Sequence, residues 1–169
     1  MFTSGMKIAF CVTLFSAMAQ AEPSISVSGN VVASPCTVDT DTVNKTVELG
    51  SLQRRDLQMA GEGGEWQNFD LLLTNCPAGT TRVTATLSGT PDSDDATAWK
   101  NSGTSEKIAL RIASRDHSQT IAPGDSLDQN VIISTRSASF PLSARMFTPQ
   151  GSATAGTFQA VMNVDFTWQ

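Results

Sequence analysis

Apolar and polar residues alternate along much of this 169-residue chain, and this alternation predicts β-strands with one buried face. The alternating segments are residues 24–31, 46–52, 69–73, 82–88, 107–112, 139–146 and 158–168, with a further apolar stretch at 131–134. Turns rich in glycine and proline lie between them. The pattern therefore predicts an all-β protein, an immunoglobulin-like sandwich of about seven short strands.

The first 21 residues have the features of a secretory signal peptide. A charged start ending at Lys7 precedes a short apolar run, and Ala19 and Ala21 supply the small residues that a signal peptidase reads. The apolar run is far shorter than the ~20 residues that span a bilayer, so we expect no membrane span. Residues 1–21 are predicted to be removed, and the exported chain begins at Glu22.

Charge and cysteine content narrow the function classes. Without Lys7 the chain has 10 basic and 16 acidic residues and a net charge of −6, which argues against nucleic-acid binding. Cys11 leaves with the signal peptide, and the remaining pair, Cys36 and Cys76, is expected to form a disulfide in an exported protein. Two distant cysteines and one histidine are too few for a metal site with four ligands, and no cofactor motif is found.

The two ends of the exported chain do not fit a self-contained sandwich. Residues 22–33 form an alternating strand with no turn to join it to a partner. The last strand is apolar on one face up to Trp168, and no later strand covers its edge. Each end taken alone is compatible with an ordinary strand of the sandwich. Taken together, they favour donor-strand complementation, in which each subunit lends residues 22–33 to the 34–169 domain of a neighbour, and this open-ended contact builds a filament.

Three segments support a family resemblance: residues 29–38 (GNVVASPCTV), residues 73–85 (LTNCPAGTTRVTA) and the C-terminal stretch from Gly156 (GTFQAVM). The chain resembles the chaperone–usher pilins, and among them the minor adaptor subunits of the type 1 fimbrial tip. The resemblance implies an incomplete immunoglobulin-like sandwich that lacks its last strand and is completed by a strand from another subunit. It also implies the disulfide between Cys36 and Cys76.

The resemblance assigns roles to individual residues and names the expected partners. The implied donor-strand positions are Pro23, Ile25, Val27, Gly29 and Val31. The implied strand for the chaperone and the acceptor groove carries Gly156, Phe158, Ala160, Met162, Val164, Phe166 and Trp168, with tryptophan at a position where these pilins usually have tyrosine. The implied partners are a periplasmic fimbrial chaperone, an outer-membrane usher and a fimbrial subunit on each side, during export through the periplasm to the extracellular fimbrium.

Two other functions are compatible with the same sequence: a major rod pilin, and a self-contained secreted carbohydrate-binding sandwich. An enzyme is not expected, because His117 is flanked by Asp116 and Ser118 in one polar segment, and adjacent residues rarely converge into a catalytic triad. Trp66 is expected to pack in the core, and Trp99 to lie in a partly exposed loop.

Overall fold

The computed structural model describes residues 25–30 and 34–169 of the chain. Residues 25–30 contain no helix or strand, and the side chains of Ile25 and Val27 are 90% and 91% exposed. Pro23 and Val31, two of the expected donor positions, lie outside the described residues, as does the predicted signal peptide.

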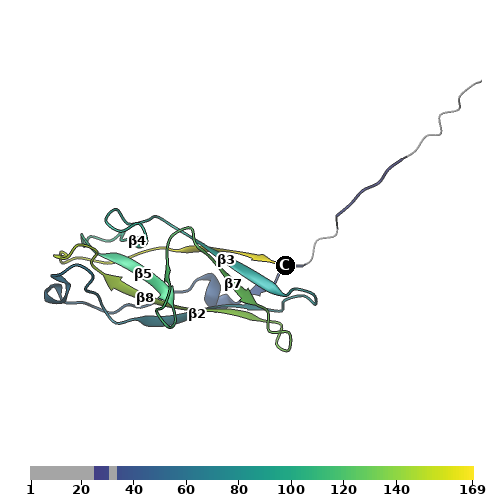
Figure 1. The fold of residues 1–169 in the computed structure, drawn as a ribbon, viewed down its shortest axis with the longest axis horizontal. Helices are drawn as coiled ribbons and strands as arrows, with labels where there is room; N and C mark the ends of the chain where they lie inside the picture. The colour runs from purple at the N-terminus through teal and green to yellow at the C-terminus, as the bar shows by residue number, and fades with distance from the viewer. Residues whose placement is uncertain (1–24, 31–33) are drawn as a thin grey trace, which may run out of the picture. The chain divides into compact units, whose positions relative to one another are not determined.

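Two antiparallel sheets form the domain (Figure 1). The larger sheet has the order β1-β2-β8-β5-β4, with β6 also paired to β5. Its strands are β1 (Thr37–Val38), β2 (Gln67–Thr74), β4 (Trp99–Lys100), β5 (Ala109–Ser114), β6 (Thr120–Ile121) and β8 (Ala138–Phe147). The smaller sheet has the order β7-β3-β9, made of β3 (Arg82–Ser88), β7 (Ser126–Asn130) and β9 (Asn163–Trp168). The all-β prediction is confirmed.

Helical structure in the described residues is limited to two single turns, α1 (Thr40–Val43) and the 3-10 turn η1 (Arg54–Leu57). Neither is long and apolar enough to cross a membrane.

The core lies between the inner faces of the sheets, where the alternation of the sequence becomes an alternation of burial. Along β3, Val83, Ala85 and Leu87 are fully buried, whereas the residues between them are partly exposed. The expected disulfide is present and joins Cys36, just before β1, to Cys76, just after β2. In the chain-entropy model a crosslink of this span stabilises the fold by about 4 kcal/mol.

The strand predicted at residues 46–52 was wrong, and the apolar stretch at residues 131–134 is not a strand either. The latter forms a bridge and turn after β7, with Ile132 and Ile133 55% and 82% exposed. Residues 46–52 are assigned to no strand. In both cases the apolar residues indicated burial, but partner strands are needed to make a ladder, and a single sequence does not specify them.

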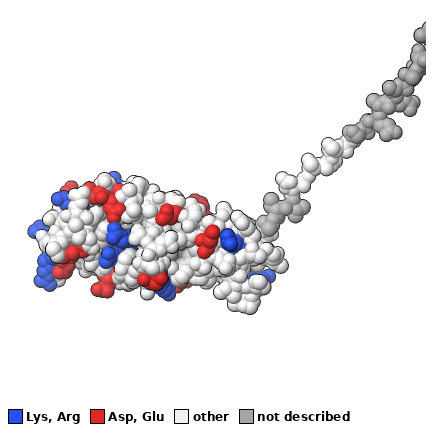
Figure 2. All heavy atoms as spheres, viewed as in Figure 1, with Lys and Arg blue, Asp and Glu red and all other residues white. Residues whose placement is uncertain are grey.

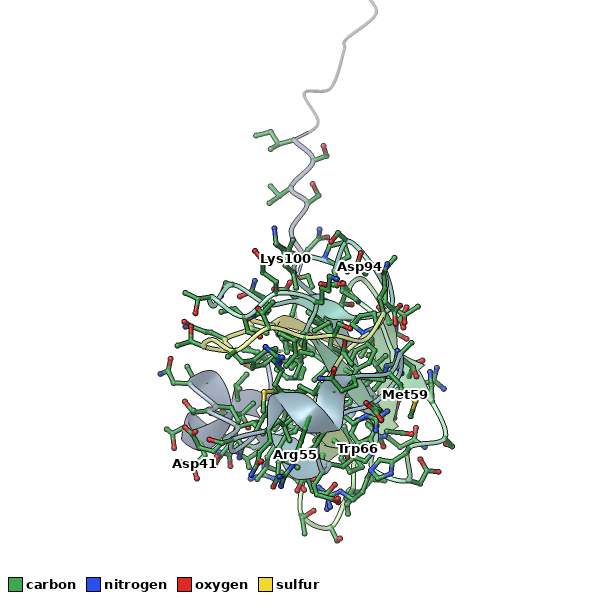
Figure 3. All side chains as sticks on the ribbon, turned by 90° about the vertical axis from the view of Figure 1, so that its left-hand side faces the viewer. Asp41, Arg55, Met59, Trp66, Asp94 and Lys100 are labelled. Atoms are coloured by element: carbon green, nitrogen blue, oxygen red, sulfur yellow. A yellow bond between two sulfur atoms is a disulfide. The ribbon has the colours of Figure 1, made fainter. Side chains whose placement is uncertain are left out.

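The two tryptophans exchange their expected roles. Trp99 is fully buried in β4, and its indole Nε1 donates a hydrogen bond to the Ile121 carbonyl at 3.3 Å. Trp66 is half-buried and lies at the periphery of the domain in the end-on view (Figure 3). Its ring stacks on His117 at 4.5 Å between centroids, and the Arg145 guanidinium lies 4.7 Å from the ring centroid. His117 is therefore a packing partner of Trp66.

Charged side chains of both signs are interspersed over the face seen in Figure 2. The least exposed ion pair of the described residues joins Arg111 to Asp95 at 2.6 Å. Burial raises the pKa of Asp95, but hydrogen bonds from Thr97 and from Arg111 outweigh that effect and leave the pKa below its ordinary value.

Candidate functional site

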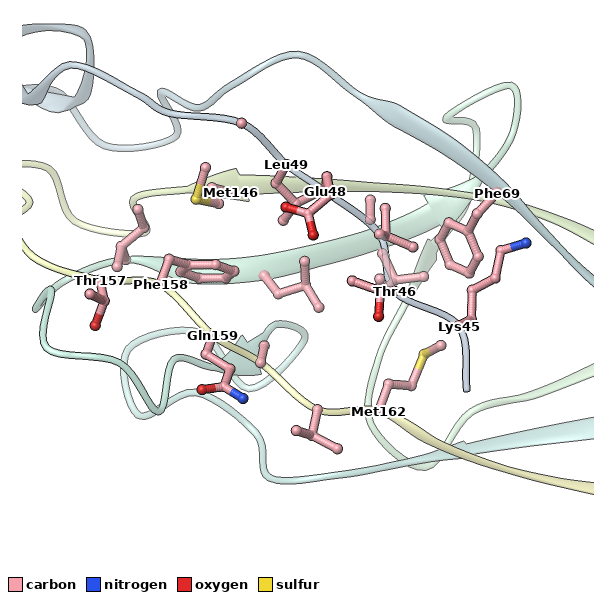
Figure 4. A pocket seen from close by; sticks show the side chains of 18 of the residues that line it. Lys45, Thr46, Glu48, Leu49, Phe69, Met146, Thr157, Phe158, Gln159 and Met162 are labelled. Atoms are coloured by element: carbon pink, nitrogen blue, oxygen red, sulfur yellow. The ribbon is translucent and has the colours of Figure 1, made fainter. Parts of the chain in front are cut away.

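A long groove of about 1330 Å³ opens between two extended segments that lie on its opposite sides (Figure 4). One wall is formed by residues 45–52 and the other by residues 156–166. The floor consists of core side chains from β2, β5 and β8, namely Phe69, Leu71, Leu110, Ile112, Ala144 and Met146. The floor side chains are buried, whereas the apolar side chains of the walls stay partly exposed, and a completed sandwich would cover them.

The first wall is apolar on its inner side and charged at its rim. Val47, Leu49 and Leu52 are half-buried and pack against the core clusters, whereas Lys45 and Glu48 are exposed. No ladder pairs this wall with another strand in the part of the chain that the structure describes. The wall is therefore an extended segment with side-chain contacts on one side and open groove on the other.

The second wall keeps a strict alternation from residue 157 to residue 169, with every odd-numbered residue exposed and every even-numbered one half-buried. The half-buried side chains are Phe158, Ala160, Met162, Val164, Phe166 and Trp168, and all six pack against the main core cluster. In β3, the strand paired with β9, the inward side chains are fully buried. The difference follows from position, because β3 is central in its sheet and β9 is at the edge.

The unpaired flank of β9 carries free backbone groups at alternate residues. Arg82 and Gln169 exchange two backbone hydrogen bonds of 2.9 and 3.2 Å. Antiparallel pairs alternate between bonded and non-bonded residues, so Asn163, Asp165 and Thr167 direct their N–H and C=O groups toward β3. The same groups of the even-numbered residues 164, 166 and 168 point toward the groove.

The free edge continues upstream of β9. Backbone groups of Thr157 and Gln159 are bonded to the loop of residues 101–106, on the side away from the groove. Phe158, Ala160 and Met162 make no backbone hydrogen bond to any described residue. In Figure 4 the Phe158 ring points into the groove, whereas the side chains of Thr157 and Gln159 point away from it. Residues 158–168 thus offer one continuous edge to an added strand.

The structure brings together the residues expected on the last strand but does not place the expected donor residues in a groove. Of the donor positions, Ile25 and Val27 are almost fully exposed, and Gly29 has no neighbour within 4 Å of a Cβ built on it. Gly156 is needed for a close approach: a Cβ there would lie 2.5 Å from the Ser105 nitrogen. On the acceptor side, all six even-numbered wall residues line the groove or pack beside it.

The sequence does not predict the first wall of the groove or the loop that supports the second wall. The alternation of Val47 and Leu49 is a usable signal for the first wall, but the same pattern is typical of a strand within the sandwich. The loop of residues 101–106 is short and polar, and its pattern resembles that of any surface turn.

A β-sandwich with an apolar groove and one unpaired edge is an incomplete, strand-accepting domain, and the sequence comparisons agree with this class. The chain belongs to the fimbrial protein family, whose sequence pattern it matches over residues 25–169. It is 43% identical to Protein FimG of Escherichia coli K12, covering 97% of this chain and 96% of FimG. It is also 41% identical to the fimbrial-like protein YdeR of the same organism, covering 95% of this chain and 93% of YdeR.

The fold is that of solved pilus subunits. A subunit of a chaperone–usher pilus superimposes with a TM-score of 0.67 at 19% identity, covering 91% of this chain and 99% of that subunit. This similarity supports the fold, and the family match identifies the chain as a fimbrial subunit, a structural protein and not an enzyme.

Proposed function

We propose that this chain is a minor adaptor subunit of a type 1-like fimbria that joins its neighbours by donor-strand exchange. The observation that carries the proposal is the continuous free edge of residues 158–168 beside an open apolar groove. An extended strand placed there would satisfy the backbone groups of the edge and cover the six half-buried side chains. Each medium apolar side chain buried in the groove contributes roughly 1.5–3 kcal/mol before the cost of ordering the donor.

Residues 22–33 are the segment proposed to complete the groove of another subunit. Their alternation would direct Pro23, Ile25, Val27, Gly29 and Val31 into the groove and the serines between them toward solvent. In the described part of this segment, Ile25 and Val27 have no cover of their own. The chain thus has apolar donor side chains at one end and an uncovered groove at the other.

The geometry favours a donor that runs antiparallel to β9. The Thr81 carbonyl accepts from the Val131 N–H, and the Thr81 N–H donates to the Gln169 carbonyl. The end of β9 therefore lies beside the loop that follows Cys76. Cys36, where the chain enters the domain, is bonded to Cys76 at this same end. Because the chain enters the domain at this end, we propose that a neighbour's domain attaches at the opposite end of the groove. Its donor strand would then run antiparallel to β9, which makes a head-to-tail filament.

The adaptor role, as opposed to the role of a rod subunit, is supported by the 43% identity to FimG over nearly the full length of both chains. Before assembly, the same exposed edge would need protection, since unpaired apolar strands aggregate. A periplasmic chaperone that lends a strand, and an outer-membrane usher that exchanges it, are the proposed partners. This route would carry the subunit through the periplasm to the extracellular fimbrium.

The proposal can be tested by expressing the chain for export together with a periplasmic fimbrial chaperone. Gel filtration is expected to show one 1:1 complex. A variant that ends after Met162 lacks β9 and is expected to form none. Phe166→Asp, which keeps the chain length and places a charge on the groove side of the edge, is expected to weaken the complex, whereas Thr167→Asp, on the exposed side, is expected to leave it intact.

A monodisperse, heat-stable monomer that does not bind the chaperone would refute the proposal. The self-contained secreted binding module would then become the leading interpretation. A major rod subunit is distinguished by self-complementation: it takes up a peptide of its own residues 22–33 with a large rise in melting temperature, whereas an adaptor with a different donor does not.

A further inference from the structure

The segment before β9 is hydrogen-bonded to the loop of residues 101–106, and the side chain of Asn101 makes two of these bonds. Asn101 Nδ2 donates to the Ser105 carbonyl at 2.7 Å and to the Thr157 carbonyl at 3.4 Å. Its Oδ1 accepts from the Gly103 and Gln159 backbone nitrogens, both at 2.8 Å. Two donors and two acceptor sites are the full capacity of a side-chain amide, so this asparagine is saturated.

The bonds of Asn101 have two different targets. Those to Ser105 and Gly103 hold its own loop, residues 101–106, in shape. Those to Thr157 and Gln159 reach the groove wall more than 50 residues later in the chain. The amide therefore joins the loop to two successive odd-numbered residues of the wall, as a paired strand would do in a ladder.

Other bonds reinforce this connection between loop and wall. The backbone nitrogens of Ser102 and Ser105 donate to the Gln159 and Thr157 carbonyls at 2.7 and 3.0 Å. The Thr104 hydroxyl accepts from the Thr157 nitrogen at 2.9 Å. The loop thus satisfies both the N–H and the C=O of Thr157 and Gln159.

Two glycines make the close approach sterically feasible. A Cβ on Gly156 would lie 2.5 Å from the Ser105 nitrogen and 2.7 Å from the Thr104 carbonyl carbon. A Cβ on Gly103 would collide with the Thr157 carbonyl oxygen. Both collisions involve backbone atoms, which cannot rotate away as a flexible side chain would. Either glycine replaced by a larger residue would separate the loop from the wall.

We propose that Asn101 is a positioning residue for strand capture: its amide takes the place of a ladder partner and keeps Phe158 and Ala160 in line with β9. This inference rests on the proposed function. Without the connection, residues 157–161 would have no fixed backbone, and the donor would meet only the half of the edge that β3 supports. With it, residues 158–168 are already extended as one strand, so less conformational entropy is lost when the donor binds.

The experiment compares Asn101→Ala and Asn101→Asp with Asn130→Ala in the exported chain. Asn101→Asp keeps the shape and the Oδ1 acceptor but places a carboxylate oxygen against the Ser105 and Thr157 carbonyls. Asn130 is an exposed residue of β7 for which no side-chain hydrogen bond is found among the described residues, so its variant is the matched control. The first readout is amide hydrogen exchange, and the second is the lifetime of the complex with a fimbrial chaperone.

Asn101→Ala removes the acceptor of the Gln159 N–H and is expected to lose protection at this amide, while the Thr167 amide, bonded to β3, stays protected. Asn101→Asp keeps that acceptor, so a smaller loss is expected, caused by repulsion between the carboxylate and the Ser105 and Thr157 carbonyls. Protection at Thr167 also reports that the variants are folded. The chaperone complex is expected to dissociate about tenfold faster, corresponding to the loss of one or two hydrogen bonds that organise the edge.

The inference and the proposed function fail in different ways. A wild-type chain that binds no chaperone overturns both. A wild-type complex whose lifetime is unchanged by Asn101→Ala and Asn101→Asp overturns the role of Asn101 and leaves the proposed function standing. An unaltered Gln159 amide in Asn101→Ala also overturns it, because the connection would then not depend on Asn101.

Discussion

Proline substitutions at two adjacent residues of β9 test which backbone N–H groups face the groove and which are bonded to β3. The Val164 N–H points toward the groove, whereas the Asp165 N–H belongs to the bonded pair with Thr86. Proline has no N–H, so it is tolerated where the N–H faces an open edge and not where it faces a partner. Val164→Pro and Asp165→Pro therefore differ in effect although they are neighbours.

The magnitudes follow from the partner that each change leaves behind. Asp165→Pro leaves the Thr86 carbonyl without its donor in a paired strand, which costs about 1–3 kcal/mol in addition to steric conflict with β3. Val164→Pro breaks no bond in the free domain and trims only a half-buried side chain, for which we expect a loss of about 1 kcal/mol or less. In the complex with a donor strand, Val164→Pro becomes costly, because one carbonyl of the donor is left without a hydrogen-bond donor. That penalty of about 1–3 kcal/mol corresponds to a roughly 5- to 150-fold weaker complex.

Urea unfolding of the free chain and gel filtration with a fimbrial chaperone measure the two effects. We expect Asp165→Pro to lose stability, whereas Val164→Pro keeps most of its stability and binds the chaperone weakly. Equal destabilisation of the free chain by both variants would refute the assignment of the free edge. Full chaperone binding by Val164→Pro would refute the claim that the donor pairs with this edge.

Three further predictions concern other parts of the domain. Replacing Cys36 and Cys76 by serine is expected to lower the free energy of unfolding by about 4 kcal/mol, measured in denaturant without a reductant. Phe158→Ala is expected to cost about 1–2 kcal/mol in the free chain and about 3–5 kcal/mol with a donor in place, whereas Leu73→Ala, fully buried away from the groove, costs about 2–5 kcal/mol in both states. Hydrogen bonds from Ser114 and Ser118 lower the pKa of Asp116 to about 2. Their stabilising effect is therefore complete above the ordinary pKa of 3.8 and is lost as the pH falls toward 2. An NMR titration of the carboxyl group should show this midpoint, and Ser114→Ala should raise it.

The elements that the sequence predicted well are those in which the pattern alone decides burial. The alternation in β3, and that of the last strand from Phe158 to Trp168, corresponds to the observed inward and outward faces, and β8 follows it except at Ser143, which is fully buried. Alternation does not show whether a strand has a partner. The pattern at residues 46–52 therefore predicts a ladder strand, although these residues form a groove wall. The exchange of roles between Trp66 and Trp99 has a similar origin, because tertiary contacts with Ile121, His117 and Arg145 decide which indole is enclosed.

The support of the groove by Asn101 could not have been predicted, since its targets lie more than 50 residues away and a polar loop has no period. The physical problem that it solves was visible in the sequence. A domain that leaves a groove open for a partner loses the ladder that would normally fix the groove walls, yet those walls must stay extended to receive a strand. In the downstream half, β3 holds the wall from behind. In the upstream half no strand of the described chain does so, and a saturated side-chain amide with two glycines at the contact holds the wall from the same side. Both supports lie opposite the groove, so the edge that faces the partner stays free along its whole length.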